Sequence, residues 1–90
     1  MEHWIFKDSA LKHGYGKEDF TQVSRNPKLV LRSRRGFRNV YEILGQNDAG
    51  DYLHIITRRI RRERDMMVIV FHMGRMNDID RRRFVKVVKK

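Results

Sequence analysis

Met66-Met67-Val68-Ile69-Val70-Phe71 is an uninterrupted apolar run near the carboxyl end of the 90-residue chain. Apolar runs of this length that are rich in β-branched residues are typical of a strand covered on both faces. We therefore expect residues 66–71 to form the central strand of a sheet. No linker, internal repeat or low-complexity segment interrupts the chain, so residues 1–90 are predicted to form a single domain.

Three further strands are predicted before this run, each followed by a turn signal. They cover residues 28–32, 39–44 and 52–57, the last extending into Arg58 and Arg59. Glycines mark the turns at Gly36 and Gly50, and residues 61–65 are expected to form the loop that leads into the strand at 66–71. Short turns between successive strands indicate an antiparallel meander of four strands.

Helical signals flank these strands. Residues 5–13 are predicted to form a short helix that Gly14 stops, and acidic residues after Gly16 begin a second helix that ends at about Arg25. Asn77 is the expected N-cap of a helix that continues to the end of the chain. The predicted fold class is α+β, with two short N-terminal helices, a four-stranded antiparallel meander sheet, and a C-terminal helix on the same face.

Positive charge is concentrated in the last third of the chain. The formal net charge is +10; residues 1–57 hold nine Lys/Arg and seven Asp/Glu, whereas residues 58–90 hold twelve and four. Such a field attracts polyanions or acidic proteins. The chain has no cysteine, which excludes disulfides and thiolate sites, and no apolar run long enough for a membrane span. We expect a cytoplasmic protein that needs neither metal nor cofactor.

Histidine and arginine at the end of the apolar run are the first catalytic candidates. His72 follows the strand and precedes Arg75 by three residues, so both side chains are candidates to converge on one phosphate. The alternative is that His72 simply ends the strand and bonds to backbone. His54 faces His72 only if the hairpin centres on Glu63; taken alone, it is better explained as structural. His13, which precedes Gly14, is better explained as a helix cap.

Arginines supply the predicted contacts to phosphate. The expected hairpin tip carries only arginine as its basic residue, and guanidinium groups grip phosphate through paired hydrogen bonds and stack on bases. The alternative is a solvated turn. The residues concerned are Arg58, Arg59, Arg61, Arg62 and Arg64, with Arg81 and Arg82 on the last helix as further candidates.

Two charged residues lie on the expected core face of the last helix. An apolar stripe at helical spacing is predicted to pack on the sheet, and Asp80 and Arg83 point into it. They form either a mutually satisfied pair or the wall of a catalytic site, and both alternatives stay open. On the second strand, Glu42 is a potential base, although a solvent-facing role is the commoner one. The stripe consists of Met76, Ile79, Phe84, Val87 and Val88.

Three stretches, read in order, resemble the BrnT family of type II toxins. They are Trp4 with Lys12-His13-Gly14, Glu18-Asp19 and Asn26-Pro27; then residues 45–53 around the glycine turn; then Ile69-Val70-Phe71-His72 with Arg75, Met76, Asp80 and Phe84. The resemblance implies a RelE-like fold and a metal-independent endoribonuclease that cleaves messenger RNA. It also implies a co-encoded DNA-binding antitoxin with an acidic segment as partner.

The chain departs from that pattern at two positions. With Asn77 as the cap, the arginine typical of the family falls on Gly74, and Phe84 stands where a tyrosine is usual. These departures motivate the alternative of a non-catalytic basic module that binds RNA or the ribosome. A third alternative is that the basic face serves only to be covered by an acidic antitoxin.

Overall fold

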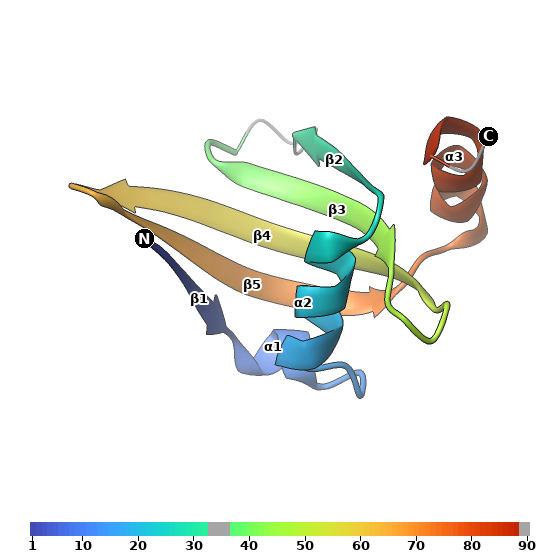
Figure 1. Cartoon of the computed structure of the whole chain (residues 1–90), viewed down its shortest axis with the longest axis horizontal. Helices are drawn as coiled ribbons and strands as arrows, with labels where there is room; N and C mark the ends of the chain where they lie inside the picture. The colour runs from blue at the N-terminus through green and yellow to red at the C-terminus, as the bar shows by residue number, and fades with distance from the viewer. Residues whose placement is uncertain (33–36, 89–90) are drawn as a thin grey trace.

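The computed structural model describes residues 1–32 and 37–88 as a small α+β domain built on one five-stranded mixed sheet (Figure 1). The strand order is β1-β5-β4-β3-β2. In chain order, the elements are β1 (Glu2–Phe6), α1 (Asp8–Leu11), α2 (Lys17–Arg25), β2 (Lys28–Arg32), β3 (Val40–Gln46), β4 (Tyr52–Arg62), β5 (Asp65–Arg75) and α3 (Asp78–Val88). The predicted turn at Arg34-Arg35-Gly36 lies outside the described residues.

The amino terminus overturns the predicted four-stranded architecture. β2, β3, β4 and β5 are paired antiparallel in succession, but β1 adds a fifth strand that runs parallel to β5, with Trp4 opposite Val68 and Phe6 opposite Val70. The predicted helix over residues 5–13 is therefore wrong. Its helical part is reduced to the four residues of α1.

The burial of alternate side chains explains why the amino terminus forms a strand. Trp4 and Phe6 point into the domain, where both rings meet Phe20 of α2 edge to face, at centroid distances of 4.7 and 5.6 Å. Ile5 between them is exposed. This alternation has a period of two, which a strand satisfies and a helix does not.

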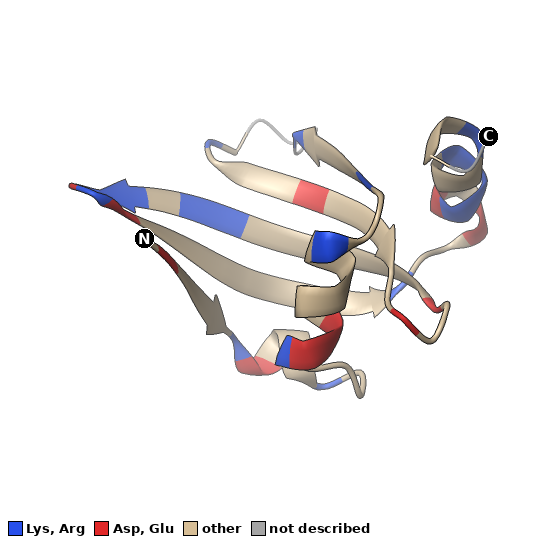
Figure 2. Cartoon of the chain, viewed as in Figure 1, with Lys and Arg blue, Asp and Glu red and all other residues tan. Residues whose placement is uncertain are grey.

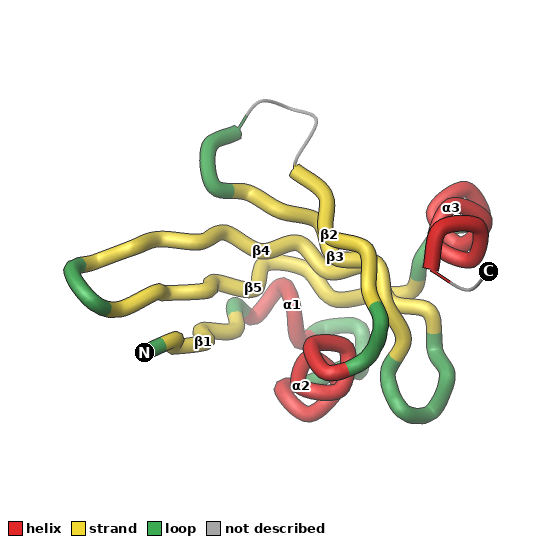
Figure 3. Tube along the Cα trace, turned by 45° about the horizontal axis from the view of Figure 1, so that its top comes forward, coloured by secondary structure: helices red, strands yellow, loops and turns green. Residues whose placement is uncertain are grey.

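The two short N-terminal helices cover one face of the sheet, which we call the covered face (Figure 3). Phe20 and Val23 of α2 are buried against it, and an added Cβ on Gly45 of β3 would lie only 2.8 Å from Val23 Cγ1. Helix and sheet thus approach each other closely at this glycine. The buried core of this face comprises Ala10, Phe20, Val23, Ile43, Leu53, Ile55, Val68, Val70 and Met73.

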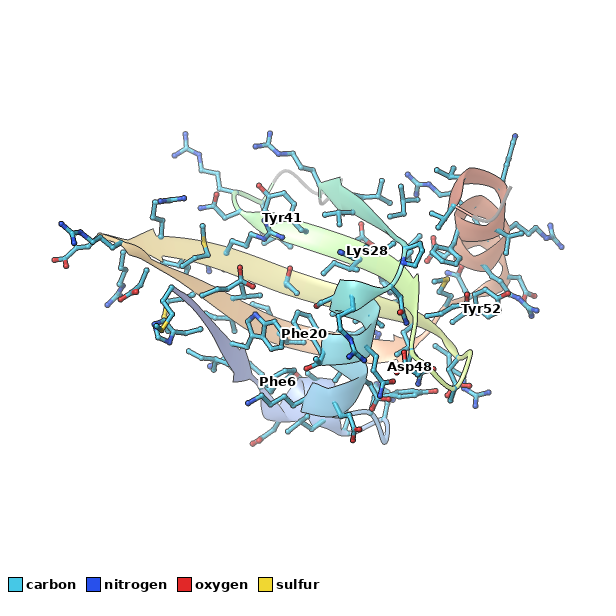
Figure 4. All side chains as sticks on the ribbon, viewed as in Figure 1. Phe6, Phe20, Lys28, Tyr41, Asp48 and Tyr52 are labelled. Carbon is cyan, nitrogen blue, oxygen red and sulfur yellow. The ribbon has the colours of Figure 1, made fainter. Side chains whose placement is uncertain are left out.

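The last helix, α3, does not join the other two helices. It lies at the end of the sheet beside β2 and β3, where the buried ring of Phe84 meets Tyr52 edge to face at 5.9 Å (Figures 1 and 4). The predicted stripe is only partly correct, because Ile79 is 75% and Val87 52% exposed. α3 therefore leaves most of the second face of the sheet uncovered; we call it the open face.

The strand at 66–71 is interior but not central. β4 occupies the middle of the sheet, and β5 lies between it and β1. The hairpin between β4 and β5 is also tighter than expected: the predicted loop over residues 61–65 shrinks to Glu63 and Arg64, and Glu63 adopts φ 53°. Most of the basic hairpin is thus strand, not loop.

Candidate functional site

The open face carries the candidate site because of how β4 and β5 pair. A bulge at Phe71 shifts the register, so His72 lies opposite Ile56 and His54 opposite Gly74. The register considered from the sequence, with His54 opposite His72, is therefore not the observed one. Since residues two apart on a strand share a face, the two histidines are diagonal neighbours on the open face.

Three histidines and a carboxylate form a continuous row across this face. The ring centroids of His13 and His72 are 5.3 Å apart, and those of His72 and His54 are 5.5 Å apart. His54 Nε2 lies 2.8 Å from Glu42 Oε1. The row therefore crosses the sheet from the loop after α1, over β5 and β4, to β3; we call it the histidine row.

Gly74 makes room for the row. A Cβ added there would lie 3.1 Å from His72 Nε2 and 3.6 Å from His13 Cδ2, closer to the His72 ring than side chains normally approach. The absence of a side chain at this position lets the two rings meet across it. Gly74 is also the position at which the resemblance would place an arginine, so the row occupies the space that such a side chain would need.

The surroundings of His72, the middle histidine of the row, disfavour its protonated form. Burial lowers the pKa of His72 from its ordinary value of 6.5, and the neighbouring His54, His13 and Lys12 lower it further. His72 is therefore neutral near pH 7 and able to accept a proton. A neutral imidazole with a free ring nitrogen can act as a general base.

The row is reachable from solvent. The side chains of His54 and Glu42 are 19% and 31% exposed, and His13 is exposed. Across residues 1–32 and 37–88, no cluster of three or more histidine, cysteine or acidic side chains has a geometry that could hold a metal ion.

Arg75 does not converge with His72. Three residues along the strand place it on the covered side, where its Nε donates to Tyr15 Oη at 3.1 Å. That hydrogen bond, followed by the charges of Tyr15 and Asp51, raises the pKa of Arg75. Tyr15 Oη in turn donates to Asp51 Oδ2 at 3.3 Å. Arg75 thus belongs to a small network at the end of the sheet.

The two charged residues of the last helix lie apart from the histidine row. Asn77 caps α3, because its Oδ1 accepts a hydrogen bond from the Asp80 backbone N at 2.8 Å. Asp80 and Arg83 are partly buried, and within the described part of the chain no ion pair joins them. The mutually satisfied pair is therefore not formed, and a role for the two residues in the wall of a site stays a prediction.

The arginines of the hairpin divide between the two faces. By alternation along β4, Arg58 and Arg62 extend from the open face that carries the histidine row, whereas Arg59 and Arg61 extend from the other. Arg59 lies over the Tyr41 ring at 5.1 Å. Arg64 lies in the turn. Figure 2 shows these basic positions along β4, toward the hairpin end.

The last helix adds a second guanidinium-aromatic pair. Arg81 lies over the Tyr52 ring at 4.7 Å, at the end of β4 opposite to the hairpin. Tyr52 precedes His54 by two residues and shares its face. Arg82 is exposed and lies on the solvent side of α3. Basic groups therefore lie on both sides of the histidine row.

The sequence does not predict that His13 and Glu42 join the two other histidines. It predicts a helix cap for His13 and, for Glu42, either a base or, more commonly, a solvent-facing residue. The alternation along the strands could have predicted the contact between Glu42 and His54. Each is a polar residue within an apolar strand, and antiparallel pairing places such residues on the same face. For His13, no local signal exists, because its neighbours come from residues 54–74.

No model of a protein family and no curated protein matched this chain. The site is therefore interpreted from its own geometry. In residues 1–32 and 37–88, no helix has both the length and the apolar character that crossing a membrane would require.

Proposed function

We propose that this protein is a metal-independent endoribonuclease that cleaves single RNA strands on its open face. The observation that carries the proposal is the histidine row: three imidazoles and a carboxylate in contact, solvent-accessible, and flanked by arginines. Cleavage of RNA without metal needs a base for the 2′-hydroxyl, an acid for the leaving oxygen and cations for the phosphorane. The row and its flanks contain each of these groups.

His72 is the proposed base. Its lowered pKa keeps it neutral near pH 7, so it accepts the 2′-hydroxyl proton as the 2′-oxygen bonds to phosphorus. His54 is the proposed acid, because the Glu42 carboxylate orients its ring and offsets the charge of its protonated form. Its proton goes to the 5′-oxygen as the P–O5′ bond breaks, leaving a 2′,3′-cyclic phosphate. Lys12 supplies positive charge beside the phosphorane, and His13 supplies a ring N–H.

Arginines of the open face are the proposed RNA grip. Arg58 is four residues from His54 on the same strand and face, a distance of about 13 Å at strand spacing. Arg62 continues the same line toward the hairpin tip. A strand of RNA that crosses the histidine row can therefore run along β4 with its phosphates beside these guanidinium groups.

The biological setting we propose is the toxin half of a type II toxin–antitoxin pair in the cytoplasm. Its support is the resemblance to BrnT toxins described above, together with the uneven positive charge of the chain. The proposed partners are messenger RNA and a co-encoded DNA-binding antitoxin with an acidic segment. Induced expression should arrest growth, and expression of the neighbouring reading frame should relieve the arrest.

The chemistry is tested with purified protein and RNA in excess chelator. Wild type should cut, and His72→Ala should cut about 100-fold to 10,000-fold more slowly, the usual contribution of one general base. His3→Ala is the matched control, because His3 is exposed, lies outside the row, and contacts Asp65 at 3.6 Å instead. If His72→Ala cuts as fast as His3→Ala, the row is not the active site.

Salt dependence separates the ribonuclease from a non-catalytic RNA-binding module. Phosphate contacts alone give steeply salt-dependent binding without bond cleavage. RNA that stays intact through long incubation with wild-type protein, although it is bound at low salt, would favour the module over the enzyme.

A further inference from the structure

A pocket lined by Tyr52, which precedes His54 of the histidine row by two residues, has features that suit a nucleobase. It has a volume of 250 Å³, below the range of about 300–1,000 Å³ typical of whole small-molecule sites. It opens at the end of the sheet, where β4 begins and β5 passes into α3. The residues lining it are Gly50, Asp51, Tyr52, Arg75, Met76, Asp78 and Arg81.

The pocket offers a flat cationic surface. Arg81 Cζ lies over the Tyr52 ring, 4.7 Å from its centroid, and Arg81 is exposed, so part of its guanidinium is accessible to a ligand (Figure 4 labels Tyr52). Guanidinium planes stack on nucleobases, and bases in single strands are recognised in this way. A base in this pocket would therefore extend the existing Tyr52–Arg81 stack by one layer.

Hydrogen-bonding groups of both kinds surround that surface. The Nε of Arg75 donates a hydrogen bond to Tyr15, and within residues 1–32 and 37–88 its two terminal nitrogens form no hydrogen bond or ion pair. In the same residues the carboxylate of Asp78 forms no ion pair. A ligand in the pocket thus meets N–H donors from Arg75 and acceptor oxygens from Asp78. Two carboxylates at the pocket disfavour a phosphate there.

These features select among the bases. Guanine presents two adjacent N–H donors, N1–H and the N2 amino group, which match one carboxylate, and it presents acceptors at O6 and N7, which match an arginine. Uracil has no amino group, and adenine presents no acceptor at position 6. Guanine is the base whose donors, acceptors and ring face all find partners in this pocket.

We propose that the pocket binds an unpaired guanine next to the scissile phosphate, and so determines where RNA is cut. The statement that this guanine lies next to the cleaved bond rests on the proposed ribonuclease function. The statement that the pocket binds guanine rests on the pocket alone. Tyr52 lies two residues before His54 on the same face, about 7 Å away at strand spacing. That separation suits a base attached to a phosphate at the histidine row.

Binding is measured first, without cleavage, using wild-type protein and fully 2′-O-methylated hexanucleotides whose attacking hydroxyl is blocked. Three probes differ at one position: guanine, inosine, which lacks the N2 amino group, and uracil. We expect the guanine probe to bind about 10-fold more tightly than either of the others, the discrimination typical of one paired contact. Equal affinity for the guanine and inosine probes would overturn the proposal.

Asp78→Asn locates the contact. It should abolish the preference for guanine over inosine, whereas Glu18→Gln, which makes the same charge change in the first turn of α2, should keep it. Circular dichroism confirms that both variants are folded. An Asp78→Asn variant that still prefers guanine would place the base elsewhere and overturn the proposal.

Cleavage mapping then separates the two proposals. Wild-type cuts clustered next to guanine, and scattered in Asp78→Asn, would support the pocket as the determinant of the cut site. Guanine-selective binding by a protein that never cuts unmodified RNA would support the pocket and sink the ribonuclease. Cutting with no guanine preference in either assay would overturn the pocket alone.

Discussion

The two faces of the sheet are built from the same strands but follow different rules. On the covered face, Leu53, Ile55 and Met73 have no exposed surface and pack under α2. On the open face, the neighbouring positions His54, Ile56 and His72 are only partly buried, although they alternate with core residues along the same strands. The covered face satisfies packing, and the open face keeps polar groups available.

In this small domain, the residues that stabilise the fold and those of the candidate site lie largely on different faces of the sheet. A 90-residue chain buries a limited share of its surface, about 60% for domains in this size range. Here the main cluster of buried apolar residues lies on the covered face, while the open face presents a row of ionisable groups that would be costly to bury without partners. Variants on the two faces should therefore change different properties.

The largest contrast is expected between Ile55→Ala and Ile56→Ala. Ile55 has 0% exposure, so its truncation should lower the free energy of unfolding by about 2–5 kcal/mol. Ile56 is adjacent in sequence but only partly buried on the open face. Its truncation should lower the free energy of unfolding by about 1 kcal/mol. Chemical denaturation of both variants measures the difference. Equal losses would show that the open face is packed as the covered face is.

The sequence allowed much of the sheet to be predicted. β2, β3, β4 and β5 each carry local signals, namely alternation or an apolar run bounded by glycine turns, so their positions followed from the sequence. β1 did not, because Trp4-Ile5-Phe6 becomes a strand only through its pairing with β5, more than 60 residues away. A short apolar segment does not by itself distinguish helix from strand.

The site shows the same limit more sharply. His72 and His54 were recognisable as polar residues in apolar strands, but their contact depends on the bulge at Phe71, which no pattern in the sequence marks. The separation of Arg75 from His72 also follows from strand parity beyond residue 71. β4 and β5 are longer than predicted, so the alternation of side chains between the two faces continues through residues that the sequence predicts as loop.

Two glycines provide a second comparison between the faces. Gly45→Ala should destabilise the protein by about 1–3 kcal/mol, because the new methyl would meet Val23 Cγ1 at 2.8 Å in the buried core. In Gly74→Ala, the atoms nearest to the new methyl belong to the rings of His72, which is partly buried, and of His13, which is exposed. It should therefore cost less stability but displace the row.

Thermal unfolding and RNA cleavage, measured together, test this pair. Gly45→Ala should lower the melting temperature and leave the specific activity of the folded fraction unchanged. Gly74→Ala should change the melting temperature less and should lower the specific activity. If Gly74→Ala retains full activity, the close approach of the two rings is not needed for catalysis.

Paired arginine variants sharpen the comparison further, because alternation divides the hairpin between the faces. Arg58→Ala with Arg62→Ala removes two guanidinium groups from the open face, whereas Arg59→Ala with Arg61→Ala removes two from the other. The first double variant should reduce the slope of log affinity against log salt by about 2, one for each lost phosphate contact. The second should leave the slope nearly unchanged, and equal effects would show that RNA does not distinguish the faces.

The smallest effect is expected in the pH dependence of stability. The pKa of His72 is lowered in the folded protein by burial and by its cationic neighbours, so below pH 6.5 the unfolded chain binds more protons than the folded one. The stability contributed by a neutral His72 is complete above pH 6.5 and falls as the solution is acidified toward the folded pKa. His72→Gln removes this dependence, so the stability of wild type relative to that variant should decline between pH 7.5 and pH 5.5, as urea unfolding at each pH would measure. A relative stability that rises on acidification would mean that the folded protein favours a protonated His72, and a protonated ring would be unsuited to act as the base.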